Sequence, residues 1–124
     1  MPATILVVDD SRTMRAMVKA ALLAGDYQVV EAPGAREALL ALDAAPVDLV
    51  ITDVNMPEID GITLVRRLRA RPREATTPIL VLTTEASEAL KARGREAGAT
   101  GWLVKPFQPA QLLQTVRQVL GAGA

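Results

Sequence analysis

The sequence predicts an α/β fold in which five helices cover a five-stranded parallel sheet. Short apolar runs alternate along the chain with longer segments in which apolar residues recur at helical spacing. The short runs are mostly continuous rather than alternating with polar residues, which is the pattern of parallel strands covered on both faces. Five runs and five helical segments in alternation therefore favour a doubly wound α/β sandwich.

The expected strands are runs such as TILVV, DLVIT and PILVL, rich in β-branched and aliphatic residues. Two of them end abruptly at an aspartate, and the fourth ends at a pair of threonines. Such endings mark where a buried strand reaches a polar edge. We expect the five strands at residues 4–8, 27–31, 48–52, 78–82 and 101–104.

The expected helices are delimited by capping residues and by proline. Ser11 is a suitable N-cap for the first helix, which Gly25 ends, and Gly98 ends a helix over residues 88–97. Pro72 prevents extension of the third helix, and Pro109 begins the last one. In the first, second, third and last helices, the apolar residues at helical spacing are Met14, Met17, Val18, Ala21 and Leu22; Ala35, Ala38, Leu39 and Leu42; Ile62, Leu64, Val65 and Leu68; and Leu112, Leu113, Val116, Val119 and Leu120, respectively.

The composition restricts the possible functions. A chain of 124 residues fits one domain, and its 14 basic and 14 acidic side chains cancel, so no overall positive field attracts nucleic acid or an anionic membrane. The chain has no cysteine and no histidine. Disulfides, thiol nucleophiles and the usual neutral-pH base are therefore excluded. With no signal-peptide pattern and no run of membrane-spanning length, we expect a cytoplasmic protein without membrane insertion.

Polar side chains gather where the expected strands end. Asp9 and Asp10 follow the first strand, Asp53 the third, Thr83 the fourth and Lys105 the fifth. In an open parallel sheet, ligands bind beyond the carboxyl ends of the strands. We therefore expect three carboxylates, one hydroxyl and one ammonium group to meet at a single edge.

This set of groups suits phosphoryl transfer. Three carboxylates repel one another, and Mg²⁺, which prefers oxygen ligands, relieves that repulsion. Asp53 then acts as the nucleophile and forms an acyl phosphate, whose oxygens are engaged by Mg²⁺, Thr83 and Lys105. Each residue alone has an ordinary structural explanation as a cap, a turn residue or a surface charge. Their placement at successive strand ends favours the functional interpretation, because capping alone does not supply the cation.

The segments ILVVDDS, DLVITDVNMPEIDG, VLTT and LVKPF, in this order and spacing, resemble the receiver domain of bacterial two-component response regulators. The resemblance extends over nearly the whole chain. It implies a flavodoxin-like strand order 2-1-3-4-5, a single receiver domain over residues 1–124 without an output domain, and phosphorylation of Asp53 by a partner histidine kinase. It also implies self-phosphorylation from small phosphodonors and autodephosphorylation, in a signalling protein rather than an enzyme.

The same resemblance implies a role for each site residue. Asp10, Asp53 and the backbone carbonyl of Asn55 bind the metal, and Asp9 supports it through water. Thr83 and Lys105 become the switch residues that contact the phosphoryl group.

Within this family, the sequence most resembles the single-domain chemotaxis regulators. Asn55 and Glu85, each two residues after a key site residue, match the types found there, at positions that tune the lifetime of the phosphorylated state. We therefore expect a short-lived signal. Trp102 departs from the family, which usually has Tyr or Phe as its switch aromatic. Either the indole swings inward behind Thr83, or it only covers the sheet on the side of the fourth helix.

The expected output is a phosphorylation-sensitive surface of helix four, strand five and helix five that binds a downstream protein, with chemotaxis or motility as the expected setting. A phosphate sink or a phosphorelay intermediate is the alternative within the family. An aspartate-nucleophile phosphatase is disfavoured because Asn55 stands where such enzymes place a second acid. A flavin- or nucleotide-binding module is disfavoured because Asp9 and Asp10 replace the phosphate-binding loop, and no Gly-x-Gly-x-x-Gly pattern occurs.

Overall fold

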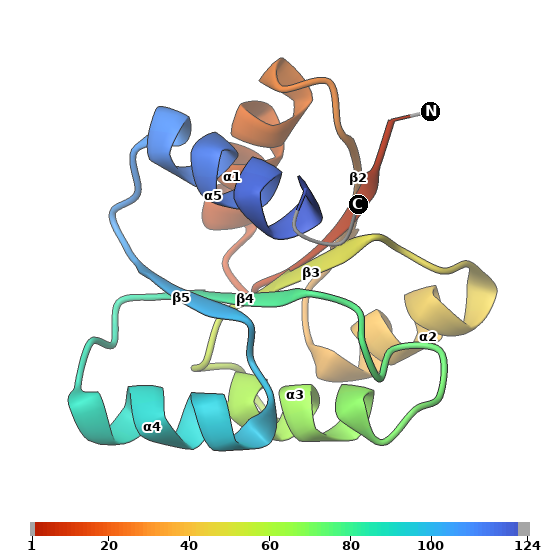
Figure 1. Ribbon diagram of the computed structural model, residues 1–124, viewed down its shortest axis with the longest axis vertical. Helices are drawn as coiled ribbons and strands as arrows, with labels where there is room; N and C mark the ends of the chain where they lie inside the picture. The colour runs from red at the N-terminus through yellow and green to blue at the C-terminus, as the bar shows by residue number, and fades with distance from the viewer. Residues whose placement is uncertain (1, 122–124) are drawn as a thin grey trace.

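Five strands form one parallel sheet in the order β2-β1-β3-β4-β5 in the computed structural model, which describes residues 2–121 (Figure 1). This order confirms the one implied by the family resemblance. The strands are β1 (Thr4–Val8), β2 (Gln28–Ala32), β3 (Leu49–Thr52), β4 (Ile79–Thr83) and β5 (Gly101–Val104). The helices are α1 (Arg12–Ala24), α2 (Ala35–Ala44), α3 (Gly61–Arg69), α4 (Glu88–Ala97) and α5 (Pro109–Gly121).

Five expected boundaries, which belong to three strands, were wrong by one residue; among them, β2 ends at Ala32 rather than residue 31, and β4 begins at Ile79 rather than residue 78. β2 begins at Gln28 rather than residue 27, because the Tyr27 amide donates to the Leu22 carbonyl at the end of α1. β3 begins at residue 49 instead of 48. β4 extends to Thr83, which pairs in register with Val104 of β5. The expected switch threonine is thus the last residue of a central strand.

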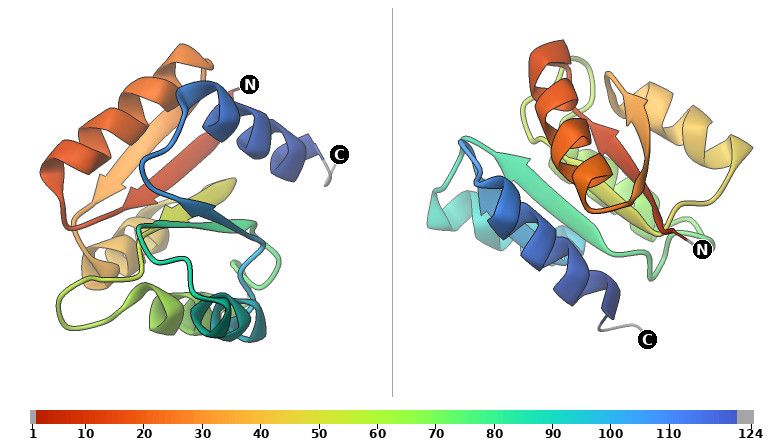
Figure 2. Two further views of the ribbon diagram at one scale, coloured as in Figure 1. Left: turned by 90° about the vertical axis from the view of Figure 1, so that its left-hand side faces the viewer. Right: turned by 90° about the horizontal axis from the view of Figure 1, so that it is seen from above.

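The helices lie in two layers. Figure 1 shows α1 and α5 on one face of the sheet and α2, α3 and α4 on the other, and Figure 2 shows the same layers from two further directions. Each layer covers its own hydrophobic cluster. One cluster includes Leu6 and Val8 of β1, and the other includes Ile5 and Val7. Successive residues of a strand point to opposite faces, so a continuously apolar run serves both clusters.

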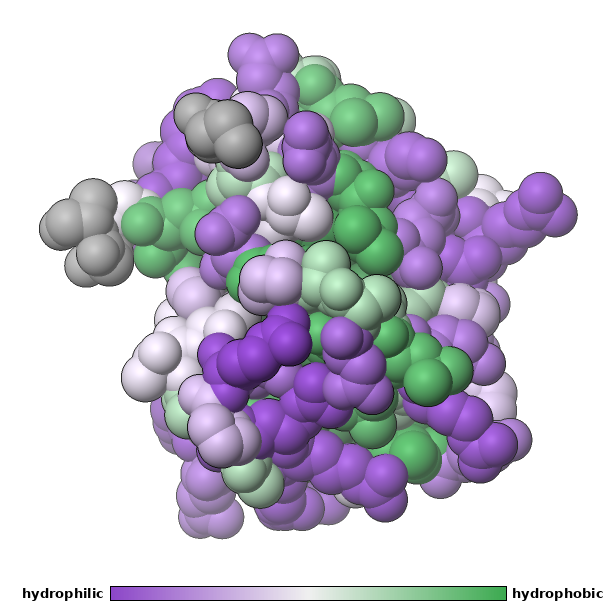
Figure 3. Space-filling model, turned by 90° about the vertical axis from the view of Figure 1, so that its right-hand side faces the viewer, coloured by the Kyte–Doolittle hydropathy of each residue, from purple (hydrophilic) through white to green (hydrophobic). Residues whose placement is uncertain are grey.

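The edge strands are less buried than the three central ones. All residues of β3 and β4 are buried, whereas β2 and β5 are largely half-buried or exposed. Figure 3 shows a mixed polar and apolar surface on the right-hand side of the molecule as it is drawn in Figure 1. The expectation of continuously apolar strands therefore holds for the centre of the sheet only.

Side-chain caps start the helices next to the strand ends. The Ser11 hydroxyl accepts a hydrogen bond from the Met14 amide, as expected, and Asp60 and Ser87 cap α3 and α4 in the same way. Gly98 ends α4 with φ of 112°, a conformation that glycine adopts without strain. No helix between residues 2 and 121 is both long and apolar enough to span a membrane.

Candidate functional site

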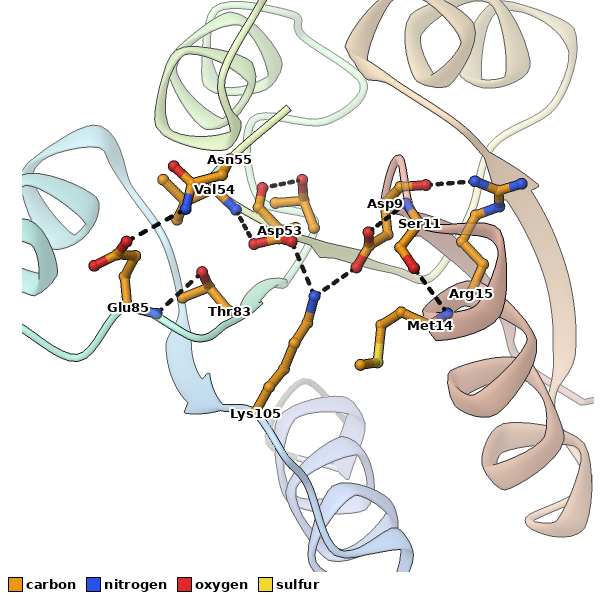
Figure 4. Close-up of polar contacts among 11 residues, drawn as sticks. Asp9, Ser11, Met14, Arg15, Asp53, Val54, Asn55, Thr83, Glu85 and Lys105 are labelled. Carbon is orange, nitrogen blue, oxygen red and sulfur yellow. Dashed lines mark hydrogen bonds and ion pairs between the residues drawn. The ribbon is translucent and has the colours of Figure 1, made fainter. Parts of the chain in front are cut away.

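Backbone hydrogen bonds just beyond the strands bring the expected site residues together. The Asp9 amide donates to Ala32, the last residue of β2, and the Asp53 amide donates to the carbonyl of Val8 in β1. The Lys105 amide donates to the carbonyl of Thr83 in β4. Each site residue is therefore held against the end of a neighbouring strand, and Figure 4 shows their side chains converging at this edge.

Lys105 bridges two of the three aspartates. Its Nζ lies 2.7 Å from Oδ2 of Asp9 and 2.9 Å from Oδ2 of Asp53. The exposed fractions of these side chains are only 7 % for Lys105, 6 % for Asp9 and 12 % for Asp53. Burial by itself lowers the pKa of Lys105, but the hydrogen bonds and charges of both carboxylates outweigh it and raise that pKa above the ordinary lysine value. Lys105 is thus a charged ammonium group at neutral pH.

Asp10 completes a cluster of three carboxylates. One oxygen from each of Asp9, Asp10 and Asp53 lies within 4.8 Å of the other two. Asp10 is exposed to solvent, whereas Asp9 is buried. Oxygen donors in this number and spacing are those that hard divalent cations such as Mg²⁺ prefer, and an exposed carboxylate leaves room for bound water. The residues present therefore fit the metal that the sequence suggested.

Asp9 is held at its main chain as well as at its carboxylate. Nη1 of Arg15 donates to the Asp9 carbonyl oxygen at 2.6 Å, and the Ser11 amide donates to Asp9 Oδ1 at 2.9 Å. Arg15 in turn lies 3.4 Å from a carboxylate oxygen of Glu31 in β2. The sequence analysis missed Arg15. The available signal was a basic residue in the second turn of the helix that follows the acidic pair.

Asp53 lies where α3 begins against the end of β3. Its Oδ1 accepts a hydrogen bond from the Val54 amide at 2.6 Å, and its carbonyl oxygen accepts one from the Thr52 hydroxyl. A Cβ at Gly61 would overlap the Asp53 carbonyl oxygen. Gly61 therefore permits the close approach of α3 to the Asp53 main chain. The sequence analysis did not identify this role of Gly61.

Glu85 connects the other polar residues at the mouth of the site. The hydroxyl of Thr83, a buried residue, accepts a hydrogen bond from the Glu85 amide at 3.3 Å. Nδ2 of Asn55 donates to the Glu85 carboxylate at 3.4 Å, and Nε1 of Trp102 donates to the Glu85 carbonyl at 2.9 Å. Asn55 and Glu85 also line a hollow of about 240 Å³ between the β3–α3 loop and α4. The structure thus links both residues expected to tune lifetime with Thr83 and Trp102.

Comparison with known proteins agrees with this geometry. Residues 5–117 match the family model described as the response regulator receiver domain. The chain belongs to this family. The resemblance stated from the sequence motifs is therefore confirmed. Receiver domains bind Mg²⁺ at their acidic site, interact with histidine kinases and downstream targets, and act as signalling proteins rather than as enzymes in the usual sense.

The similar proteins include stand-alone chemotaxis regulators. The receiver domain is 43 % identical over 119 residues to chemotaxis protein CheY1 of Helicobacter pylori, covering 94 % of this chain and 96 % of that protein. It is 40 % identical over 122 residues to a CheY homolog of Campylobacter jejuni, covering 97 % and 94 % of the two chains.

Solved structures of receiver domains have the same fold. Chemotaxis protein CheY4 of Vibrio cholerae is 45 % identical, with a TM-score of 0.93 and coverage of 96 % of this chain and 99 % of that chain. The receiver domain of a sensor histidine kinase from Pseudomonas aeruginosa is 26 % identical, with a TM-score of 0.90 and coverage of 98 % and 99 %. That second structure contains a magnesium ion coordinated in the active site cleft.

Proposed function

We propose that this receiver domain is a response regulator that accepts a phosphoryl group on Asp53 from a histidine kinase. The observation that carries the proposal is the Lys105 ammonium group, 2.9 Å from Oδ2 of Asp53 within a cluster of three carboxylates. A structural capping role for the acids explains neither the buried cation between them nor their convergence from different strands. The proposed location is the cytoplasm.

The transfer forms one bond and breaks one. An Asp53 oxygen attacks the phosphorus of a phosphohistidine, the P–N bond breaks with its electrons going to the imidazole, and Asp53 becomes an acyl phosphate. Asp10, Asp53 and the Asn55 carbonyl would hold Mg²⁺, with Asp9 supporting it through water, and the bound ion would supply positive charge to the phosphoryl oxygens. Lys105 stays beside Asp53 and neutralises a further oxygen.

Thr83 and Glu85 connect the phosphorylated site to the α4–β5–α5 surface. The Thr83 hydroxyl that now accepts from the Glu85 amide turns toward the phosphoryl group. That movement releases the Glu85 amide at the start of the β4–α4 connection. The proposed consequence is a shifted population of the α4–β5–α5 face, which binds a downstream protein. Hydrogen exchange should therefore change along α4 and β5 when Asp53 is phosphorylated.

The same residues support a short-lived signal in chemotaxis or motility. Asn55 and Glu85 lie at the mouth of the site, joined by a 3.4 Å contact, where their polar groups leave a path for attacking water. The similarity to the chemotaxis regulators of Helicobacter and Campylobacter supports the biological setting. A phosphate sink or a relay intermediate uses the same chemistry and differs only in where the phosphoryl group goes after Asp53.

Intact-mass analysis after incubation with a small phosphodonor tests the proposal. We expect a single added phosphoryl group that requires Mg²⁺ and is absent from Asp53→Asn. Asp26→Asn is the matched control, because Asp26 lies beyond the C-terminal end of α1 and adopts a positive φ that asparagine also tolerates. Modification that persists in Asp53→Asn would reassign the acceptor. Multiple turnover of small phosphate esters would instead revive the phosphatase alternative.

A further inference from the structure

The indole of Trp102 rests directly on the backbone of α4. A Cβ at Gly94, in the middle of that helix, would lie 2.6 Å from Cζ3, 3.1 Å from Cε3 and 3.7 Å from Cη2 of Trp102. All three atoms belong to the six-membered ring of the indole. The missing side chain of Gly94 therefore forms the slot that this ring fills.

Glycine at this position has no local reason to be there. Gly94 has helical neighbours on both sides, and glycine is among the poorest residues for a helix interior. It is also buried, so it does not serve as an exposed hinge or a C-cap; Gly98 fills that second role. The contact with Trp102 accounts for Gly94, and the two residues form a matched pair.

A second contact fixes the other end of the indole. Nε1 of Trp102 donates to the Glu85 carbonyl at 2.9 Å, so the flat ring is held by α4 on one side and by the β4–α4 connection on the other. Outward rotation would break this hydrogen bond and expose the ring. Nothing in the contacts of Trp102 requires it to move when Thr83 reorients.

We propose that Gly94 forms the seat of Trp102, by which we mean the slot on α4 that holds the indole ring. We further propose that the indole stays in this seat whether or not Asp53 is phosphorylated. The signal then passes from Thr83 through the Glu85 main chain to α4 and Trp102 together, rather than by rotation of the aromatic ring. The pairing of Gly94 with Trp102 follows from the contacts alone. The statement about the phosphorylated state rests on the proposed function.

The Glu85 main chain suits this role because it bonds to both residues. Its amide donates to the Thr83 hydroxyl and its carbonyl accepts from Trp102. When the hydroxyl turns away, the amide is released while the carbonyl remains attached to the indole. A displacement of Glu85 therefore moves the ring and the α4 backbone beneath it as one unit.

A double-mutant cycle tests the seat without phosphorylation. In the natural background, Gly94→Ala should lower the thermal unfolding midpoint, because the rigid anchored indole leaves its slot to admit the methyl group. In the Trp102→Phe background, the benzene ring of the indole, which fills the slot, is gone. Gly94→Ala should then raise the midpoint, as Gly-to-Ala changes in helices ordinarily do. The same sign in both backgrounds would overturn the pairing. Glu96→Ala, at an exposed position of α4, is the control whose effect should be equal in both.

Tryptophan fluorescence tests the second part, since Trp102 is the only tryptophan of the chain. Acrylamide quenching should give one quenching constant that is unchanged after phosphorylation and that rises in Gly94→Ala. A quenching constant that changes severalfold in the natural sequence on phosphorylation would show that the ring rotates, and would overturn the fixed seat. Intact mass measured on the same samples reports the modification of Asp53. A failure of the proposed function is thereby distinguished from a failure of this inference.

Discussion

At the scale of single residues, Lys105 compensates a concentration of negative charge. Its ammonium group contacts Asp9 and Asp53, and all three side chains are nearly buried. Removing one partner of a buried ion pair leaves an uncompensated charge, which is far more destabilising than the loss of an exposed pair. Lys105→Met should therefore lower the free energy of unfolding by about 3 kcal/mol in the absence of Mg²⁺.

Added Mg²⁺ should recover part of this loss, because it neutralises the same carboxylates. Denaturant unfolding with and without Mg²⁺ measures both effects. Lys91→Met is the control: its Nζ lies 3.8 Å from Glu88, whose side chain is 86 % exposed, so the change should be below about 0.5 kcal/mol. An equal loss in the two variants would contradict a charge-compensating role for Lys105.

Arg15 should affect metal binding without touching the metal. It donates to the Asp9 carbonyl and so fixes the main chain from which two carboxylates of the cluster project. Arg15→Gln and Arg15→Lys should both raise the dissociation constant for Mg²⁺ by roughly tenfold, the usual effect of losing a residue that orients a metal ligand. Isothermal titration calorimetry is the measurement.

The two Arg15 variants separate positioning from charge. If only charge mattered, Arg15→Gln would tighten Mg²⁺ binding by removing a positive neighbour, and Arg15→Lys would leave it unchanged. Arg12→Gln removes the same charge from an exposed position on α1 and serves as the control. Tighter binding in Arg15→Gln would therefore rule out the positioning role.

At the scale of helices and strands, Arg69 joins three elements at the end of the sheet opposite the site. Its guanidinium donates to the carbonyls of Glu74 and Thr77, which precede β4, and of Gly98, which ends α4. Burial lowers the pKa of Arg69, but it remains charged at neutral pH. The side chain thus satisfies backbone acceptors that the α3–β4 connection cannot pair within itself.

Arg69→Ala should lower the free energy of unfolding by about 3 kcal/mol, because several carbonyls lose a charged donor. The rate of phosphorylation of Asp53 should stay within about twofold of the natural rate, since the site lies at the other ends of the strands. Arg67→Ala, on the exposed side of the same helix, should change stability by less than about 0.5 kcal/mol. A large fall in phosphorylation rate in folded Arg69→Ala would show coupling between the two ends of the sheet.

The positions of the helices and strands could be predicted from the sequence, but several contacts between them could not. Apolar periodicity and caps located every helix and strand, because they reflect local burial. The one-residue errors occurred where hydrogen bonding decides, as for Tyr27, whose amide bonds to α1, and for Thr83, which continues the ladder to β5. The site acids and Lys105 were predictable because parallel strands end at one edge. Glu85 as a shared partner and Gly94 as a seat were not, since both depend on three-dimensional contacts without a local sequence signal.

At the scale of the whole molecule, the metal site exists only in the folded chain. Asp9 and Asp53 come from different strands, and their carboxylates approach because β1 and β3 are neighbours in the sheet. A ligand that binds the folded state alone stabilises it by mass action. Mg²⁺ at about 100 times its dissociation constant should therefore raise the free energy of unfolding by about 2.7 kcal/mol.

This stabilisation should appear as a rise of roughly 10 °C in the thermal midpoint, given the entropy of unfolding of a domain of this size. Asp10→Asn should lose most of the rise. Asp43→Asn should keep it, because Asp43 pairs with Arg71 away from the site. An equal rise in Asp10→Asn would place the Mg²⁺ effect elsewhere and remove the metal from the proposed chemistry. Because this measurement needs no phosphodonor, it tests the metal site even if Asp53 proves not to be the acceptor, and so separates the two halves of the proposed function.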